Sequence, residues 1–202
     1  MNELDNMGEL DNTMIIFTSD NGPTDWPFYY EEGYYPPGST GPFFGRKWSL
    51  YEGGIRMPFI ISWLGKIPEG TVDSSTVISS VDLFPSLCKI ASATLPENTK
   101  LDGEDLSDAF FGNPVERDTD LYWYYVNDPR PGKEEYVSPF LAMRSRQWKL
   151  LMEPDGSDLQ LFNLDNDIDE SENLVKEHPD LVSRMSEKLY EWYVKTVVEN
   201  TK

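Results

Sequence analysis

The chain has 202 residues, of which 39% are hydrophobic and 13% aromatic, and its formal net charge is −19. This length and composition allow one substantial core, or one core and a small second domain, and they exclude an intrinsically disordered chain. The acidic charge excludes nucleic acid and an anionic membrane surface as partners, because no basic stripe is present to neutralise phosphates.

Three further classes of feature are missing from the sequence. Cys88 is the only cysteine, which excludes an internal disulfide. No stretch approaches the roughly 20 apolar residues that span a bilayer. The first residues lack the basic and apolar regions of a signal peptide.

The first predicted elements are a helix end and a strand. Leu4, Met7 and Leu10 recur at three-residue intervals, as in the last turns of an amphipathic helix. Residues 14–18 form an apolar and β-branched run closed by polar residues, which predicts a strand buried on both faces. A helix feeding such a strand is half of a βαβ unit, so we expect the chain to begin within an α/β domain.

The Ser-Asp-Asn-Gly segment, residues 19–22, directly follows this strand. Open α/β sheets bind ligands beyond the carboxyl ends of their strands. The Asp20 carboxylate and the Asn21 amide carbonyl are hard oxygen donors that suit Mg²⁺ or Ca²⁺ better than zinc. Asp-Asn-Gly is also ordinary turn chemistry, so the segment is a metal-site candidate or a turn.

A long aromatic segment follows, and then a run of cations. Residues 23–44 are crowded with aromatics, prolines and glycines and predict a long loop, either a platform for sugar or aryl rings or a satellite core. Residues 45–58, here called the cationic motif, read Gly-Arg-Lys-Trp-Ser-Leu-Tyr-Glu-Gly-Gly-Ile-Arg-Met-Pro. Arg46, Lys47 and Arg56 place three cations among glycines in an acidic chain, which indicates an anionic substrate group.

The rest of the chain predicts a strand and helices and then a small antiparallel sheet. Residues 59–63 read as a buried strand, residues 81–93 as a helix with Cys88 as a small buried hydrophobe, and residues 101–112 as a turn and short helix. Closely spaced strands are expected at residues 121–126, 140–144, 147–152 and 160–164, followed by an acidic loop at 165–173 and a final helix that begins near His178. The apolar face of that helix should cover the sheet; it consists of Leu181, Val182, Met185, Leu189, Trp192 and Tyr193.

Together, the Ser-Asp-Asn-Gly segment and the cationic motif resemble the second half of a formylglycine-dependent sulfatase of the alkaline-phosphatase-like superfamily. The resemblance extends from Met1 to about Tyr193. It implies the end of an alkaline-phosphatase-like α/β catalytic domain at residues 1–117, followed by a small α+β subdomain at residues 118–202 with a four-stranded antiparallel sheet and a C-terminal helix.

The same resemblance implies roles for individual residues. Asp20 and Asn21 would ligate Ca²⁺, and Lys47 would contact the sulfate near the leaving oxygen. Arg56 would support the site from behind or form a structural ion pair. Arg46 departs from the glycine that commonly precedes the lysine, and its longer side chain would crowd or extend the anion site.

Several parts of a sulfatase are not found in this sequence. No cysteine or serine opens a Cys/Ser-x-Pro/Ala-x-Arg motif, the source of the formylglycine nucleophile; Cys88, for instance, is followed by Lys-Ile-Ala-Ser. The usual acidic pair of the calcium site and the catalytic histidine have no counterpart, and His178 is expected to be a surface or capping residue. We therefore expect the remainder of the catalytic domain upstream and no activity from this chain alone.

The sequence favours one function over two alternatives. The favoured function is that of a sulfatase fragment whose parent is expected to hydrolyse sulfate esters on a sugar, in the periplasm or outside the cell, as the family implies. The first alternative is a non-catalytic module that binds sulfated glycans. The second is a phosphate or phosphonate ester hydrolase of the same superfamily, which the single histidine disfavours.

Overall fold

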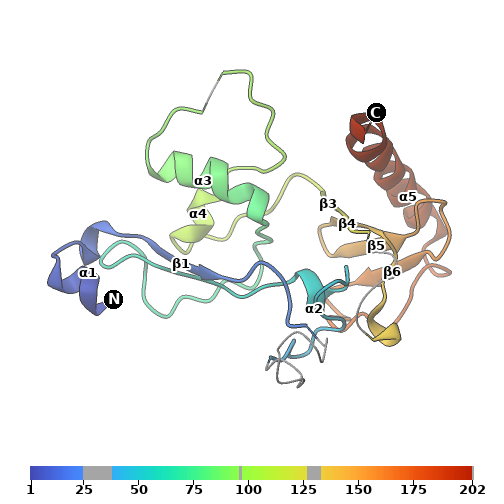
Figure 1. Cartoon of the computed structure of the whole chain (residues 1–202), viewed down its shortest axis with the longest axis horizontal. Helices are drawn as coiled ribbons and strands as arrows, with labels where there is room; N and C mark the ends of the chain where they lie inside the picture. The colour runs from blue at the N-terminus through green and yellow to red at the C-terminus, as the bar shows by residue number, and fades with distance from the viewer. Residues whose placement is uncertain (25–37, 96, 127–132, 202) are drawn as a thin grey trace. The chain divides into compact units, whose positions relative to one another are not determined.

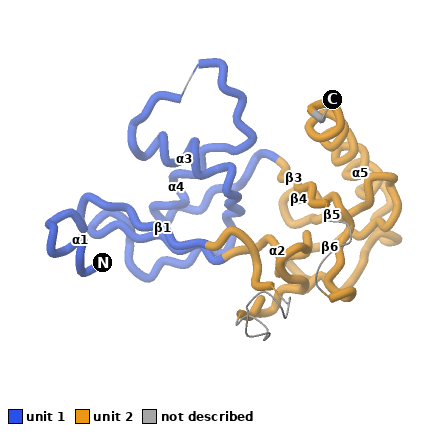
Figure 2. Tube along the Cα trace, in the orientation of Figure 1, with its two compact units in different colours: residues 1–18, 58–119 blue, residues 19–57, 120–202 orange. Residues whose placement is uncertain are grey.

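The computed structural model describes residues 1–24, 38–95, 97–126 and 133–201. Its residues cluster into two compact units (Figure 2), the first formed by Met1–Thr18 and Pro58–Thr119 and the second by Ser19–Met57 and Asp120–Lys202. Residues 19–57 are thus grouped with the C-terminal sheet. The division into domains at residue 117 stays a prediction.

The first unit combines a two-stranded sheet with short helices (Figure 1). In chain order its elements are α1 (Asn2–Asn6), a 3-10 turn (Leu10–Asn12), β1 (Ile15–Thr18), β2 (Phe59–Ser62), a second 3-10 turn (Ser80–Asp82), α3 (Leu83–Ile90) and α4 (Ser107–Phe110). The two strands are antiparallel, with Ile15 opposite Ser62 and Thr18 opposite Phe59.

The expectation that residues 14–18 are buried on both faces is wrong for this structure. Phe17 is 62% exposed, and Ile60, which lies opposite it in β2, is 60% exposed. Within the described residues, β1 has only the one hydrogen-bonded neighbour strand. An apolar run shows that its side chains favour burial, but the layers that would cover them have to come from other segments.

The helix predicted over residues 81–93 is confirmed, as the second 3-10 turn followed by α3. Pro85 lies in the first turn of α3, where its missing N–H costs no helical hydrogen bond. Cys88 is only partly buried, in contrast to the expected burial.

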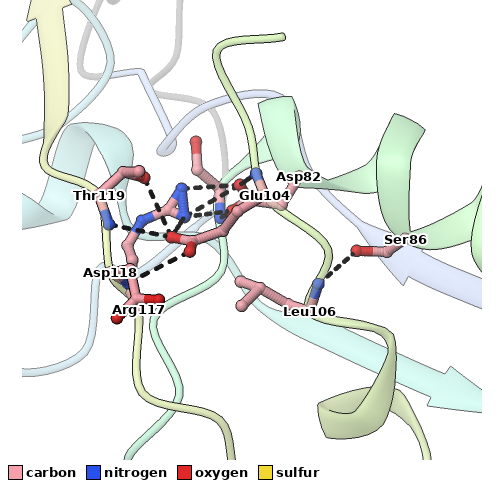
Figure 3. A network of polar contacts seen from close by, with 8 residues as sticks. Asp82, Ser86, Glu104, Leu106, Arg117, Asp118 and Thr119 are labelled. Carbon is pink, nitrogen blue, oxygen red and sulfur yellow. Dashed lines mark hydrogen bonds and ion pairs between the residues drawn. The ribbon is translucent and has the colours of Figure 1, made fainter.

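A buried ion-pair network joins the start of α3 to the two loops on either side of α4 (Figure 3). The Arg117 guanidinium contacts both carboxylate oxygens of Asp82 at 2.7–2.9 Å and a Glu104 oxygen at 3.2 Å. Asp82 also accepts hydrogen bonds from the backbone N–H groups of Ser79 and Glu104. Since Asp82 is fully buried and Arg117 is 7% exposed, the network fixes loops that contain little regular structure.

The second unit consists of a four-stranded sheet, a long helix and residues 19–57. Its elements are α2 (Glu52–Ile55), β3 (Leu121–Tyr124), a 3-10 turn (Glu134–Tyr136), β4 (Leu141–Ser145), β5 (Trp148–Met152), β6 (Gln160–Asn163), α5 (Pro179–Tyr193), a π-helical turn (Val194–Val198) and a last 3-10 turn (Glu199–Thr201). The strands pair antiparallel in chain order, so the predicted four-stranded sheet is confirmed.

The sheet has α5 on one face and part of the cationic motif on the other. The α5 side (Figure 1) is formed by Leu141, Met143, Leu150, Met152 and Leu161 from the strands and by Val182, Met185 and Leu189 from the helix. On the opposite face, Leu50 and Tyr51 pack against Ala142, Leu151, Phe162 and Leu164. Because side chains alternate along a strand, both faces of β4, β5 and β6 are buried.

The aromatic loop predicted at residues 23–44 lies largely outside the described residues, which omit 25–37. In its described part, Phe44 packs edge-to-face on Tyr51 and on Tyr136, with ring centroids 4.9 and 5.5 Å apart. No helix among the described residues is long and apolar enough to cross a membrane.

We predict that Asp82→Asn lowers the free energy of unfolding of the first unit by about 3 kcal/mol, because it leaves the buried Arg117 guanidinium without its bidentate carboxylate partner. Hydrogen exchange of residues 79–119 would measure the loss. Lys188→Met is the matched control: it removes an ion pair with Asp120 in which the lysine is 58% exposed, and such pairs contribute at most about 1 kcal/mol. Equal effects from the two variants would contradict this account.

Candidate anion and metal site

The structure brings the Ser-Asp-Asn-Gly segment and the cationic motif together. The Gly22 N–H donates to the Gly54 carbonyl at 3.0 Å, and the Lys47 N–H donates to the Pro23 carbonyl at 3.1 Å. These two backbone hydrogen bonds run in opposite directions between the segments. Asp20 and Asn21 are therefore held beside the motif that carries Lys47.

This approach requires glycine at the contact. A Cβ on Gly22 would overlap the Gly53 carbonyl oxygen, and one on Gly54 would overlap the Ser49 carbonyl oxygen. The Gly53 N–H donates to the carbonyl of Phe44, the residue just before the motif, at 2.6 Å, so the two ends of the Lys47 turn are hydrogen-bonded to each other. The two consecutive glycines thus let three backbone segments meet with no side chain between them.

Lys47 lies at a strained point of the chain. Trp48, the next residue, has a φ of 75°, which is rare for a bulky side chain. Strain of this kind persists where the surroundings hold the backbone firmly, and it concentrates at functional sites. The Lys47 ammonium lies 5.8 Å from the centroid of the Trp48 ring, and the lysine is half-buried.

Arg46 and Arg56, the other two cations of the motif, also have intramolecular partners. The Arg46 guanidinium donates to the Thr24 and Gly38 carbonyls, both at 3.1 Å. Arg56 lies 3.5 Å from a Glu52 carboxylate oxygen and stacks over the Phe43 ring at 4.7 Å. Of the roles considered for Arg56, the structure thus contains the ion pair, whereas a substrate contact by Arg46 or Arg56 stays a prediction.

The donors expected for a metal are present but few. Asp20 is exposed and Asn21 is half-buried, and the Asn21 side-chain amide donates to the Gly22 carbonyl at 3.0 Å. Within the described residues, no three His, Cys, Asp or Glu side chains cluster as a metal site would require. Carboxylate and amide oxygens fit Ca²⁺ in chemistry, but two of them fall short of the 6–8 oxygens that Ca²⁺ takes.

Three consecutive residues of the motif are fixed by side chains from the C-terminal region. The Leu50 N–H donates to Ser138 Oγ at 2.8 Å. The Tyr51 hydroxyl donates to Gln160 Oε1 at 2.7 Å, and the Glu52 N–H donates to Glu170 Oε2 at 2.6 Å. The motif is thereby held along its length by residues about 90 to 120 positions later in the chain.

A buried charge cluster underlies these bonds. Lys149 on β5 is fully buried, and its Nζ lies 2.8 Å from Glu52 Oε1 and 2.8 Å from Glu170 Oε1. Arg144 lies opposite Lys149 in the register of β4 and β5, and its guanidinium is 3.8 Å from a Glu52 carboxylate oxygen. The alternation of the strands directs both cations to the face that the motif covers.

The pKa values of the two carboxylates in the cluster, Glu52 and Glu170, are shifted in opposite directions. Burial raises the pKa of Glu52, but the ammonium of Lys149 and its hydrogen bond, with Arg144 and Arg56, outweigh burial and leave that pKa below its ordinary value. Burial raises the pKa of Glu170 above its ordinary value, and the Glu52 charge adds to this while Lys149 opposes it. Glu52 is therefore the carboxylate that the cluster stabilises in its charged form.

Sequence reasoning missed Glu52, Lys149 and Glu170. A signal was present for one of them, since Lys149 is the single charge within the apolar strand Trp148–Met152. The expectation for His178 is confirmed: it is exposed, it precedes the first turn of α5, and its ring contacts Trp148 at 4.9 Å.

Comparison with known proteins identifies the family. Residues 40–195 match the model of the N-sulphoglucosamine sulphohydrolase C-terminal family. The chain therefore belongs to the sulfatase family and corresponds to the C-terminal portion of a sulfatase. The predicted resemblance to sulfuric ester hydrolases is confirmed.

Individual relatives show how much of a sulfatase this chain covers. It is 31% identical to a sulfatase of Formosa agariphila over 93% of its own length and 34% of that protein. It is also 31% identical to an N-acetylgalactosamine-6-O-sulfatase of Bacteroides thetaiotaomicron, over 94% of its length and 38% of that protein. The chain thus spans a little over one third of these relatives.

Solved structures confirm the predicted fold class. The crystal structure of Ps i-CgsB superposes with a TM-score of 0.74 at 29% identity, over 95% of this chain and 38% of that one. A glycosaminoglycan-metabolising sulfatase of Bacteroides thetaiotaomicron gives a TM-score of 0.69 at 28% identity, over 95% of this chain and 41% of that one.

We predict that Glu52→Gln destabilises the second unit at pH 7 more than Glu170→Gln does. The Glu52 pKa is lower in the folded chain than its ordinary value of 4.5, so ionised Glu52 stabilises the fold above that pH, and the effect is lost as the pH falls. The Glu170 pKa is raised, so protonated Glu170 stabilises the fold at low pH, and this contribution is lost as the pH rises through the raised pKa.

Urea unfolding of both variants at pH 7 and pH 4 measures this difference. The deficit of Glu52→Gln relative to the parent chain should shrink at pH 4. A larger loss for Glu170→Gln at pH 7 would reverse the assignment of charge within the cluster.

Proposed function

We propose that this chain supplies the leaving-group side of a sulfatase active site that hydrolyses sulfate esters on a glycan. The observation that carries the proposal is the pair of backbone hydrogen bonds that hold the Ser-Asp-Asn-Gly segment against the cationic motif. Asp20, Asn21 and Lys47 belong to the same compact unit, which supports the proposal. Such a grouping suits a metal ion and a sulfuryl group that share oxygens.

Lys47 is the proposed catalytic group. Its ammonium would contact the sulfate ester and stabilise the negative charge that develops on the leaving oxygen. Asp20 and Asn21 would hold Ca²⁺, which withdraws charge from the sulfuryl oxygens when bound. Arg56, paired with Glu52, would support the motif rather than bind substrate.

The nucleophile is proposed to lie outside these 202 residues. A formylglycine derived from a Cys/Ser-x-Pro/Ala-x-Arg motif would supply the nucleophile, and the sequence contains no such motif. The further calcium ligands and the acid and base groups would come from the same upstream part of the catalytic domain. Under this proposal the chain alone is inactive, and its parent works in the periplasm or outside the cell.

A sulfated sugar is the proposed substrate class. The Bacteroides relative is an N-acetylgalactosamine-6-O-sulfatase, and Ps i-CgsB has been solved with k-i-k-neocarrahexaose, at a TM-score of 0.70 and 29% identity. The name of the first protein thus contains a sugar substrate, and the second structure contains an oligosaccharide ligand. The shared family and fold support the same class here, without specifying the sugar or the position of its sulfate.

A second candidate is a non-catalytic module that binds sulfated glycans. The observation that favours it is the coexistence of a cationic site with the lack of a nucleophile motif in this sequence. Both candidates require Lys47 to bind the anion, and they differ in turnover once the rest of a catalytic domain is supplied.

We predict that Lys47→Ala weakens binding of N-acetylgalactosamine 6-sulfate at least about tenfold, because a direct ion contact to the sulfate is lost. Lys66→Ala is the matched control, since that lysine is exposed, stacks over Trp63 and lies outside the proposed site. Calorimetry at low and high salt would measure both. Equal affinity of parent chain and Lys47→Ala would refute the anion site.

We predict that the 202-residue chain alone does not hydrolyse an aryl sulfate in the presence of Ca²⁺, because it contains no formylglycine motif. A fluorogenic sulfate ester assay checks this, with a complete sulfatase as the positive control. Turnover by the isolated chain that disappears in Lys47→Ala would show that the nucleophile lies within these residues.

A further inference from the structure

Lys149 is a fully buried charged group beneath the cationic motif. Its exposed fraction is 0%, and its ammonium lies 2.8 Å from one carboxylate on each side, Glu52 and Glu170. Glu52 belongs to the motif, whereas Lys149 and Glu170 belong to the C-terminal region. The ammonium therefore joins the motif to the sheet by charge.

Stability alone does not account for a charge at this position. Removing a lysine and two carboxylates from water is costly, and well-packed apolar residues of similar volume usually stabilise a fold as well or better. The neighbours on the same face of the sheet, Ala142, Leu151 and Phe162, already form an apolar layer. What an ion pair adds is a defined orientation, because the Glu52 carboxylate must face the Lys149 ammonium.

The orientation of Glu52 bears on the backbone conformation around Lys47, because the residues next to Glu52 form hydrogen bonds to both neighbouring segments. Glu52 opens α2, and the residue after it, Gly53, bonds to Phe44, just before the motif begins. Gly54 receives the hydrogen bond of Gly22. Fixing Glu52 thus fixes both the turn that carries Lys47 and the contact that holds the Ser-Asp-Asn-Gly segment.

We propose that Lys149 is a positioning residue that acts through Glu52 to hold the Lys47 turn in its strained, anion-binding conformation. Glu170 completes the arrangement, because one of its oxygens accepts the Glu52 N–H while the other faces the Lys149 ammonium. The C-terminal sheet is then a working part of the site and not only a scaffold beside it. The proposal rests on the proposed function of Lys47.

The first test measures positioning without any ligand. Lys149→Met keeps the length of the side chain and removes its charge, and hydrogen exchange is followed over residues 44–56 of the full chain. Exchange there should accelerate at least about tenfold, while the α5 residues facing the sheet, such as Met185 and Leu189, keep their protection. Unchanged exchange at 44–56, or equal acceleration in α5, overturns the proposal.

Lys188→Met is the matched control, since it removes a lysine from the same unit that is paired with Asp120 at the surface. It should leave exchange at residues 44–56 unchanged. The double variant Glu52→Gln, Lys149→Met should lose less protection than the sum of the two single losses, because the two side chains act as one pair. Losses that add in the double variant would show that Lys149 does not act through Glu52, which contradicts the proposal.

The second test asks whether positioning reaches Lys47. Binding of N-acetylgalactosamine 6-sulfate is measured for Lys149→Met, Lys47→Ala and the double variant. Lys149→Met should weaken binding about tenfold in the parent chain and have no further effect once Lys47 is removed, although the two side chains belong to different elements. Additive losses would reveal a merely structural role and overturn the link to Lys47.

The two tests separate failure of this inference from failure of the proposed function. A parent chain that binds no sulfated sugar refutes the proposed anion site, and with it the role of Lys47. The exchange measurement still decides whether Lys149 holds residues 44–56, because it needs no ligand.

Discussion

The ion pair between Lys149 and Glu52 is the interaction on which the second unit depends. It joins Lys149 of β5 to Glu52 at the start of α2, residues 97 positions apart, and both side chains are buried. Each partner would be very unfavourable there without the other. The sheet and the cationic motif therefore cannot separate without exposing or stranding a charge, which makes them one structural unit despite their distance in the sequence.

The sequence predicted the regular C-terminal half well because the signals there are local. Short strands, the tight turns between them and the amphipathic face of α5 each depend on residues within a few positions of one another, and β3 to β6 and α5 follow them. The site motifs were likewise recognisable as short segments. The clustering of Glu52 with Lys149 and Glu170 was not, because no periodicity relates a glutamate of the short helix α2 to a strand lysine about 100 residues away.

β1 shows the opposite limit of local pattern. Its apolar residues predict burial on both faces, yet Phe17 and Ile60 are mostly exposed in this structure. A hydrophobic run reports the preference of the side chains and not the presence of a covering layer. Sequence reasoning and structure thus differ in the burial of this strand, although the strand itself forms as predicted.

The strain at Trp48 connects the buried charge to the chemistry. A tryptophan at a φ of 75° is unfavourable by itself, so the turn around Lys47 does not arise from its own residues. It is imposed from outside, by the hydrogen bonds of Leu50, Tyr51 and Glu52 to residues of the C-terminal region and by the glycine contacts to Gly22. Under the proposed function, the backbone that carries Lys47 is thus held in place before an anion arrives. That preorganisation lowers the cost of ordering the side chain when an anion binds.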